Sequence, residues 1–549
     1  MENVRFFLIL AVSFLGLLIY QKWQEDYTVN VSPQVVNGAP QLQEFNSQAG
    51  GSVPFIDPQF QAESESESPI PSFEPEAGSE ITVETDLLSV VISSKGGTLD
   101  SITLKDYPID PKIPDDAVEL LANKTSRTFI HQGGLAGSKG LPTHNDIYSF
   151  ERTAYKFIRD EDELVVPLYW TNKQGITIQK NYIFKRGSYL IDIEYKVFNK
   201  SPDGIKVHQY AQLKRNKESS RQGMLYLFSG AALSTPEKRY EKYDYGDLEK
   251  APINVSAKES WIAVMEHYFV AALIPEKESE NQYYSKTNTA EVFSVGFYSQ
   301  AKTIGANEQG SLLSSFYAGP KRHDLLQPLA TGLQLTVDYG MLWFIAKPLF
   351  IVLNFINDKL DNWGWAIIIL TILLKLLFYP LAAAGYRSMA NMRRVQPKLL
   401  ALKERHSDDK AQLNKDMMKL YKDERINPLG GCLPMLVQIP FFIALYWVLL
   451  ESVEMRQAPF ILWITDLSSM DPFYVLPLLM GVSMWFQQKL NPAPIDPTQA
   501  KVMKILPFVF TGFFAFFPSG LVLYWLVNNL LSIAQQWRIT RMIENSHGT

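Results

Sequence analysis

A single cationic residue inside an apolar run is the feature of this sequence with the clearest chemical meaning. Lys375 lies within Thr371–Leu377, where most of its neighbours are leucine or isoleucine. An ionisable side chain in a membrane-spanning run is costly and usually faces the protein interior or a water-filled cavity. Thr371 precedes Lys375 by one helical turn, so both side chains share one helix face. The pair predicts a polar stripe that carries a positive charge.

Two further apolar runs carry polar residues at the same spacing. The two pairs are Ser483 with Gln487 and Tyr524 with Asn528, and Trp525, next to Tyr524, is a further candidate for the same site. Helices that met along these stripes would form a hydrophilic, positively charged groove able to host polar or acidic segments of a client chain. Burying an unpaired ammonium in a dry core is costly, so we expect Lys375 to be hydrated. The alternative is that Lys375 snorkels to the membrane surface while the other polar groups pair between helices.

Methionine and aromatic residues gather in two of the same regions. Adaptable sulfur atoms and aromatic rings suit varied apolar clients. Ordinary core or lipid-facing contacts explain the same residues, so both interpretations stay open. The candidates for apolar client contact are Met480, Met484, Phe508 and Phe510.

Motifs of catalysis are missing from the sequence. The seven histidines are scattered, and no metalloprotease, phosphate-binding or dinucleotide-binding motif is present. The one cysteine, Cys432, is interpreted as a small packing residue rather than a nucleophile. We therefore expect no enzyme activity, no cofactor, no metal and no ATP hydrolysis. The net charge of −5 gives no reason to expect direct nucleic-acid binding.

The apolar runs predict a polytopic α-helical membrane protein with about six transmembrane helices, since each crossing needs about 20 apolar residues. The first is an N-terminal signal anchor within residues 1–23, uncleaved because no small-residue cleavage site follows; a cleaved signal is the alternative. The other five are Trp363–Ala383, Pro428–Leu450, Tyr474–Gln488, Val502–Phe517 and Leu521–Ile539. Pro518–Gly520 leaves room only for a tight turn, which predicts an antiparallel hairpin of the last two spans. The amphipathic segment 341–360 is expected to lie in the membrane interface.

Loop charges set the expected orientation. The loop 385–427 is rich in lysine and arginine and should be cytoplasmic, whereas 451–472 carries only Arg456 and should be external. Continuing the alternation places both termini in the cytoplasm and the large polar region outside. Within 385–427, two apolar stripes separated by residues 406–409 predict a helical hairpin. Its basic surface is either simply solvated or a weak docking site for a ribosome or nascent chain.

The polar half of the chain divides into a tether and a β-domain. Residues 24–80 are rich in Ser, Pro, Gln and Glu, a composition that cannot bury enough apolar surface to fold. Residues 81–340 contain several runs in which apolar and polar residues alternate, clearest in Ile191–Val197. With Ile176–Phe184 and the turn Lys185–Ser188 this run predicts a hairpin. We expect a large extracytoplasmic antiparallel β-sandwich.

Several motifs resemble the YidC-type membrane protein insertases, in order over residues 341–540. They are Phe378–Leu381, Gln396–Lys398, Asn427–Pro434, Gln438–Pro440, Gln457–Phe460, Trp463-Ile464, Asp466-Leu467 and Phe517–Trp525. The external β-domain after an uncleaved anchor matches the Gram-negative form of that family. The domain division that follows is anchor 1–23, tether 24–80, periplasmic domain 81–340, interfacial helix 341–360, insertase core 361–540 and cytoplasmic tail 541–549.

The resemblance implies an insertase and folding chaperone of the bacterial inner membrane. It implies nascent membrane proteins as clients, the lipid bilayer and the Sec translocon as partners, and a hydrophilic groove closed on the external side. In that family the groove charge is usually arginine, and the matching residue here is Lys375. Lysine keeps the positive charge but loses the planar donor fork of arginine. The short tail has one basic residue, Arg541, which argues against a strongly basic ribosome-binding tail.

Two other classes of function are alternatives to the insertase. A secondary transporter with a small-molecule site at Lys375 would be expected to show inverted repeats, and none is visible between the spans. An envelope enzyme would use the β-domain as its catalytic part, and the missing motifs count against it.

Overall fold

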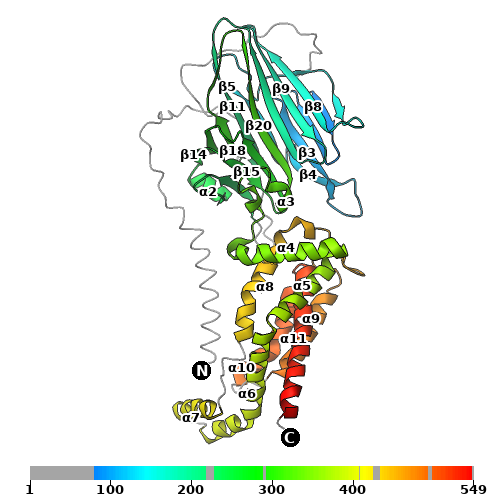
Figure 1. The fold of residues 1–549 in the computed structure, drawn as a ribbon, viewed down its shortest axis with the longest axis vertical. Coiled ribbons are helices and arrows are strands. Elements are labelled where there is room, and N and C mark those ends of the chain that lie inside the picture. The colour runs from blue at the N-terminus through cyan, green and yellow to red at the C-terminus, as the bar shows by residue number, and fades with distance from the viewer. Residues whose placement is uncertain are drawn as a thin grey trace.

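The computed structural model describes residues 79–217, 228–288, 292–406, 409–424, 433–491 and 497–546. The expected anchor 1–23, nearly all of the tether 24–80, and Cys432 therefore lie outside the described residues. Figure 1 shows a β-domain at one end, a helical bundle at the other, and helix α4 lying crosswise between them. This division confirms the predicted fold class of a β-sandwich joined to a helical membrane core.

The β-domain consists of two sheets that face each other. The larger sheet has eleven strands in the order β14-β17-β18-β11-β5-β4-β3-β2-β1-β7, with β19 paired to β11. Its strands are β1 (Glu80–Glu84), β2 (Leu88–Ser93), β3 (Thr98–Pro108), β4 (Ala117–Lys124), β5 (Arg127–Gly137), β7 (Ala154–Lys156), β11 (Ile205–Asn216), β14 (Asn254–Ala257), β17 (Asn281–Thr287), β18 (Val292–Ser299) and β19 (Lys302–Ile304).

The second sheet has nine strands in the order β13-β12-β15-β16-β20-β10-β9-β8-β6. They are β6 (Ser149–Phe150), β8 (Glu163–Thr171), β9 (Ile176–Lys185), β10 (Leu190–Asn199), β12 (Gly230–Ser234), β13 (Glu241–Tyr243), β15 (Trp261–Met265), β16 (Phe269–Pro275) and β20 (Glu308–Pro320). All its pairings are antiparallel, and the larger sheet has one parallel pair, β1 with β7.

Strand β10 shows why this sequence forms a sandwich. Ile191, Ile193, Tyr195 and Val197 are buried while the residues between them are more exposed. Each such apolar side chain contributes about 1.5–3 kcal/mol when it leaves water. The predicted hairpin is confirmed, because β10 pairs antiparallel with β9 across a turn in which Gly187 has a φ of 67°. That left-handed conformation favours glycine.

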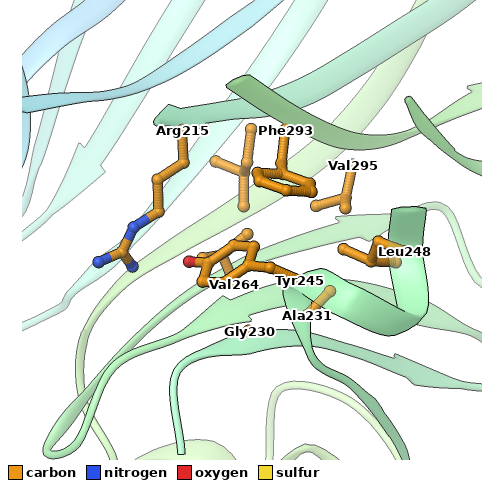
Figure 2. A pocket seen from close by; sticks show the side chains of 9 residues that line it. Arg215, Gly230, Ala231, Tyr245, Leu248, Val264, Phe293 and Val295 are labelled. Atoms are coloured by element: carbon orange, nitrogen blue, oxygen red, sulfur yellow. The ribbon is translucent and has the colours of Figure 1, made fainter. Parts of the chain in front are cut away.

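The short helix α2 (Tyr245–Lys250) covers one end of the sandwich. Beneath it lies a hollow of about 10 Å³, to which Arg215, Tyr245 and Phe293 contribute side chains (Figure 2). That volume holds about one water molecule. The hollow is therefore a small imperfection of the core and not a ligand site.

The remaining elements belong to the helical part and its junction with the β-domain. They are α3 (His323–Leu326), η1 (Leu333–Thr336), η2 (Gly340–Leu342), α4 (Trp343–Leu360), α5 (Trp363–Leu377), α6 (Tyr379–Arg405), α7 (Lys410–Asp423), α8 (Leu433–Glu451), η3 (Val453–Met455), α9 (Val475–Leu490), α10 (Pro497–Phe514) and α11 (Ser519–Ser546). By length and composition, one helix of the described residues, Gly340–Leu360, could cross a membrane; counting a bent pair as one span gives two.

The bent pair corrects the first predicted span of the second half. The sequence predicts one helix over Trp363–Ala383, but α5 ends at Leu377 and α6 continues at an angle of 67°. Pro380 lies in the first turn of α6. Proline has no N–H to bond to the preceding turn and its ring clashes with that turn, which accounts for the bend. Among the described residues, fewer helices than predicted pass the combined test of length and apolar composition. Helices α8, α9 and α10 contain proline, and α11 has 28 residues without proline but is not apolar enough to pass.

Segment 341–360 forms α4, together with the preceding turn η2. Figure 1 shows α4 lying across the upper ends of α5 and α8 instead of alongside them. This arrangement fits the predicted interfacial position, although α4 is also long and apolar enough to span.

The predicted helical hairpin of the basic loop is present. Val395 and Leu399 of α6 are buried against Met417, Leu420 and Tyr421 of α7. The side chain of Asp409 accepts a hydrogen bond of 2.9 Å from the backbone N–H of Gln412 and so caps α7. Figure 1 shows this hairpin at the opposite end of the molecule from the β-domain.

The last two helices meet differently from the predicted pairing. The chain turns between the two helices at residues 515–518, earlier than the predicted Pro518–Gly520, because Ser519 and Gly520 already belong to α11. Helices α10 and α11 both lie against α9 and approach each other mainly through aromatic rings. Phe510 and Phe514 of α10 lie 6.4 and 5.0 Å from the ring of Trp525 on α11. Large rings at this contact keep the two helix backbones apart, which a turn length alone does not predict.

Candidate functional site

Helix α5 brings Lys375 to its C-terminal end. The side chain of Asn362 accepts a hydrogen bond of 3.1 Å from the backbone N–H of Trp365 and caps the start of the helix. Lys375 lies in the last turn, where the partial negative charge of the helix end favours a cation. The run of isoleucine and leucine between them forms the apolar body of α5.

The ammonium of Lys375 joins α5 to α11. Its Nζ donates a hydrogen bond of 2.7 Å to Oγ of Ser532, and that hydroxyl donates 2.7 Å to the backbone oxygen of Asn528. Tyr386 of α6 also interacts with Ser532. Among the ion pairs of the described residues, none includes Lys375. The charge is thus held by a neutral hydroxyl and not by a carboxylate.

A second polar contact joins α9 to α11. Oγ of Ser483 donates 2.6 Å to the backbone oxygen of Met480 and accepts 3.2 Å from Nδ2 of Asn529. Both side chains are buried. The predicted stripes of α5 and α9 therefore contact the same helix, α11, as the groove hypothesis requires.

The aromatic members of the predicted site pack against α8. The ring of Phe442 on α8 lies 4.6 Å from Trp525, edge to face, and 6.0 Å from Tyr524, nearly parallel. Nε1 of Trp525 is buried and has no hydrogen-bond partner within the described residues. A buried donor without a partner is costly, so this indole is suited to bind a carbonyl or water that enters the site.

Two predicted residues do not bridge helices. The hydroxyl of Thr371 donates 2.7 Å to the backbone oxygen of Ile367 in its own helix. Gln487 is half-buried on α9. The structure thus gathers Lys375, Ser483 and Asn528 around α11 and leaves Thr371 as an internal contact of α5.

The site is drier in this conformation than the sequence predicts. Lys375 is only 5% exposed. Its ammonium contacts protein more than solvent here, so its hydration stays a prediction.

The candidates for apolar client contact are not on one surface. Met480 is fully buried, Met484 and Phe510 are half-buried, and Phe508 is 70% exposed. Helical rotation explains the split, because Phe508 lies two residues from Phe510 and faces another side of α10. Met480 is a core residue in this conformation, and the prediction that it meets clients needs a rearrangement.

Sequence reasoning missed three buried polar residues of the site. They are Asn529, Ser532 and Gln536. Ser532 and Gln536 continue the spacing of four that begins at Tyr524 and Asn528, so the signal was present. The Nε2 of Gln536 donates to the backbone oxygen of Leu490 at 3.2 Å, which extends the polar contact between α9 and α11.

The side chains of the site do not form a recognisable metal-binding group. Within the part of the chain that the structure describes, no three His, Cys, Asp or Glu side chains are grouped to hold a metal ion. The site offers a cation, hydroxyls, amides and aromatic rings. Such groups can bind a polar or acidic segment reversibly.

Two family models match the chain and together span most of it. The model described as "60Kd inner membrane protein" matches residues 355–546, and the model described as "YidC periplasmic domain" matches residues 80–352. The boundary between the two matches falls within α4.

Curated relatives match over the whole length. The chain is 45% identical over 553 residues to the membrane protein insertase YidC of Methylococcus capsulatus, with 100% of this chain and 99% of that protein covered. It is 46% identical over 561 residues to the membrane protein insertase YidC of Thioalkalivibrio sulfidiphilus, with 100% and 99% covered. A solved structure of an active YidC insertase aligns over 85% of this chain and 93% of that chain, at 18% identity and a TM-score of 0.38. The family assignment depends on the sequence matches alone.

Proposed function

The chain belongs to the YidC family of membrane protein insertases, and from this premise we propose that Lys375 and the polar face of α11 receive client segments during insertion. The observation that supports the proposal is the hydrogen bond of 2.7 Å from Lys375 to Ser532, which places a cation without a carboxylate partner between α5 and α11. A charge held this way is available to a passing acidic group.

The chemistry of insertion follows from those residues. A polar or acidic client segment enters beside the ammonium, where hydroxyl and amide groups of α9 and α11 replace part of its water shell. The apolar flanks of the client then move into lipid, because burial of apolar surface is favourable by about 25 cal/mol per Å². This partitioning supplies the driving force, so insertion proceeds without ATP hydrolysis.

Client segments reach the site from the cytoplasmic side of the membrane. We place the α6–α7 hairpin and both termini in the cytoplasm and the β-domain in the periplasm. The clients are nascent membrane proteins, which the chain inserts alone or beside the Sec translocon. A ribosome contact through the hairpin would be weak.

Charge reversal at Lys375 tests the proposal. Lys375→Glu should lower insertion of clients with acidic translocated segments, since the introduced carboxylate repels the acidic groups of the client. Lys375→Arg keeps the charge and should retain insertion. The measurement is the protease-protected fraction of a defined client in vesicles reconstituted with the full chain.

Lys489→Glu is the matched control, because Lys489 is exposed at the end of α9 with its ammonium 3.5 Å from the centre of the Trp485 ring. If the protease-protected fraction of the client is the same for Lys375→Glu as for Lys489→Glu, the buried cation has no role in insertion.

A further inference from the structure

The loop that follows α8 and η3 contacts two other helices at their outer ends, the ends that face the β-domain (Figure 1). Its central part, residues 457–469, is called the outer loop below. Gln457 and Leu462 of the outer loop have φ angles of 57° and 55°, a left-handed conformation that residues other than glycine rarely adopt. Such conformations persist only where the surrounding structure fixes them. The outer loop therefore has a defined shape, which its contacts explain.

The carboxylate of Asp466 fixes that shape. Its Oδ1 accepts hydrogen bonds from the backbone N–H of Gln457 at 3.0 Å and of Ser468 at 2.8 Å. Its Oδ2 accepts a bond of 2.6 Å from Oγ of Ser469. Hydrogen bonds to an ionised acceptor are roughly twice as strong as those between neutral groups. One side chain thus ties the first residue of the outer loop to its last two.

The outer loop binds the first turn of α11. Oγ of Ser519 donates 2.8 Å to the backbone oxygen of Asp466, and the N–H of Gly520 donates 2.9 Å to the backbone oxygen of Leu467. The first N–H groups of a helix have no partner inside it, so the outer loop provides acceptors for them. Gly520 permits the close approach, because a Cβ atom there would lie 3.1 Å from the oxygen of Leu467.

Phe460 attaches the same loop to α5. Nδ2 of Asn362, the residue that caps α5, donates 3.1 Å to the backbone oxygen of Phe460. The ring of Phe460 packs edge to face on Trp365, with 5.6 Å between the ring centres. Gly364 provides the space, since a Cβ atom at that position would overlap the Phe460 ring. The outer loop therefore joins the start of α5 to the start of α11.

These two helices carry the cation of the client site and its hydrogen-bond partner. Lys375 follows Gly364 by eleven residues, about 16 Å along the axis of α5. Beyond Leu377 the chain bends by 67° into α6 and does not extend that axis. A change of tilt at the outer end of α5 would therefore shift Lys375 relative to Ser532 on α11.

We propose that Gly364, Phe460 and Asp466 are positioning residues for insertion, which clamp the outer ends of α5 and α11 so that Lys375 stays within reach of Ser532. Every contact of this clamp lies within residues 362–520. The clamp thus belongs to the helical part of the chain and does not depend on the β-domain. This inference rests on the proposed function of the client site.

The first test measures the separation of α5 and α11 in the full chain. Spin labels at Leu376→Cys and Leu530→Cys, both exposed positions, report the distance distribution in lipid bicelles in a Cys432→Ser background. Neither label replaces a residue of the candidate site. Gly364→Leu should broaden the distribution, because the new side chain displaces the ring of Phe460.

Two further variants complete this measurement. Asp466→Ala should also broaden the distribution, since the outer loop loses the carboxylate that fixes it. Gly512→Leu is the matched control for Gly364→Leu, because a Cβ atom at Gly512 of α10 meets no other atom within 4 Å. This control should leave the distance unchanged.

Insertion is measured for the same variants with two clients that differ only in whether the translocated segment is acidic or neutral. A displaced Lys375 should lower insertion of the acidic client by about 2- to 30-fold, the range for residues that couple to a site without contacting its ligand. The neutral client should insert nearly as before. A general defect of folding would lower both equally, so the ratio of the two clients isolates the position of the cation.

A disulfide can replace the contact that Asp466→Ala removes. Met470 and Pro518 face each other in an isolated antiparallel bridge, and the Cα separation of such partners suits a disulfide. Met470→Cys with Pro518→Cys should therefore restore insertion of the acidic client by Asp466→Ala under oxidising conditions, and a reductant should remove the gain. The same disulfide should not rescue Gly364→Leu, whose defect lies at α5.

Unchanged distance distributions in Gly364→Leu and Asp466→Ala would overturn the proposal. So would an equal loss of the acidic and the neutral client, or a disulfide that leaves Asp466→Ala as impaired as before. Failure of the client site itself would look different: Lys375→Glu would insert acidic clients normally while Gly364→Leu still altered the distance.

Discussion

Removing the hydroxyl of Ser532 distinguishes a hydrated site from a dry one. Ser532→Ala deletes the 2.7 Å hydrogen bond from Lys375, together with the contacts of the Ser532 hydroxyl to Tyr386 and to the backbone oxygen of Asn528. In a dry site the ammonium would be left without a partner, and the unfolding free energy should fall by about 3–5 kcal/mol, as for other broken buried charge contacts. In a hydrated site a water molecule replaces the hydroxyl at little cost, so the fall should be below about 1 kcal/mol, the size of an ordinary hydrogen bond.

The proposed groove predicts the smaller value. The assay is reversible unfolding of the full chain in mixed micelles with increasing denaturing detergent, run as a double-mutant cycle with Lys375→Met to isolate the pairwise energy. Thr511→Ala is the control, because the Thr511 hydroxyl donates 2.7 Å to its own helix at Pro507 and serves no cation. A coupling of about 3 kcal/mol or more between Lys375 and Ser532 would refute the reasoning that water reaches the ammonium.

Three other consequences can be checked separately. Deleting residues 24–78, the part of the predicted tether that precedes β1, should leave cell viability unchanged, since its composition predicts a passive tether; loss of viability at normal protein levels would contradict this. Ser483→Cys should react with a membrane-impermeant thiol reagent from the cytoplasmic side, and complete protection would indicate a dry site. Burial lowers the pKa of Lys180 from 10.5 to about 7, so the unfolded chain binds that proton more tightly. The β-domain should therefore gain stability as the pH rises from about 7 to 10.5, and calorimetry of Lys180→Met should show a smaller gain.

Local patterns in the sequence predicted the elements with the clearest periodicity. The alternation over Ile191–Val197 identified β10, because a half-buried strand repeats every two residues. The two apolar stripes of the basic loop identified α6 and α7, because side chains on one helix face recur every three to four residues. Composition does not divide every apolar run into its elements. Residues Trp261–Ile274 form one apolar segment in the sequence, whereas in the structure Glu266–Tyr268 form the turn of the hairpin β15–β16.

The candidate site was predictable only in part. Spacing placed Lys375, Ser483 and Asn528 on polar faces, but it could not show that the faces of Lys375 and Ser483 both meet α11, the helix that carries Asn528. Ser532, the partner of Lys375, continues the spacing of four residues that begins with Tyr524 and Asn528, so the same sequence pattern also indicates Ser532.

Contacts between distant segments left no trace in the sequence. His267 caps a carbonyl at Leu450, 183 residues further along the chain, and Lys321 pairs with Glu451, 130 residues further along. Neither residue stands out by type or spacing, since an isolated histidine or lysine in a polar domain is ordinary. Only the three-dimensional structure reveals that the β-domain and α8 share these contacts.

Photocrosslinking to a stalled client tests the central claim most directly. A photoreactive amino acid at Gln487 of α9 or at Asn528 of α11, both half-buried, should capture a nascent chain whose acidic segment is halted during insertion. The same amino acid at Leu530, which is 52% exposed on α11, serves as the comparison. We predict strong capture at 487 and 528 that weakens when Lys375→Glu is added. Capture at 530 alone, or capture indifferent to the charge at 375, would contradict the cationic client site.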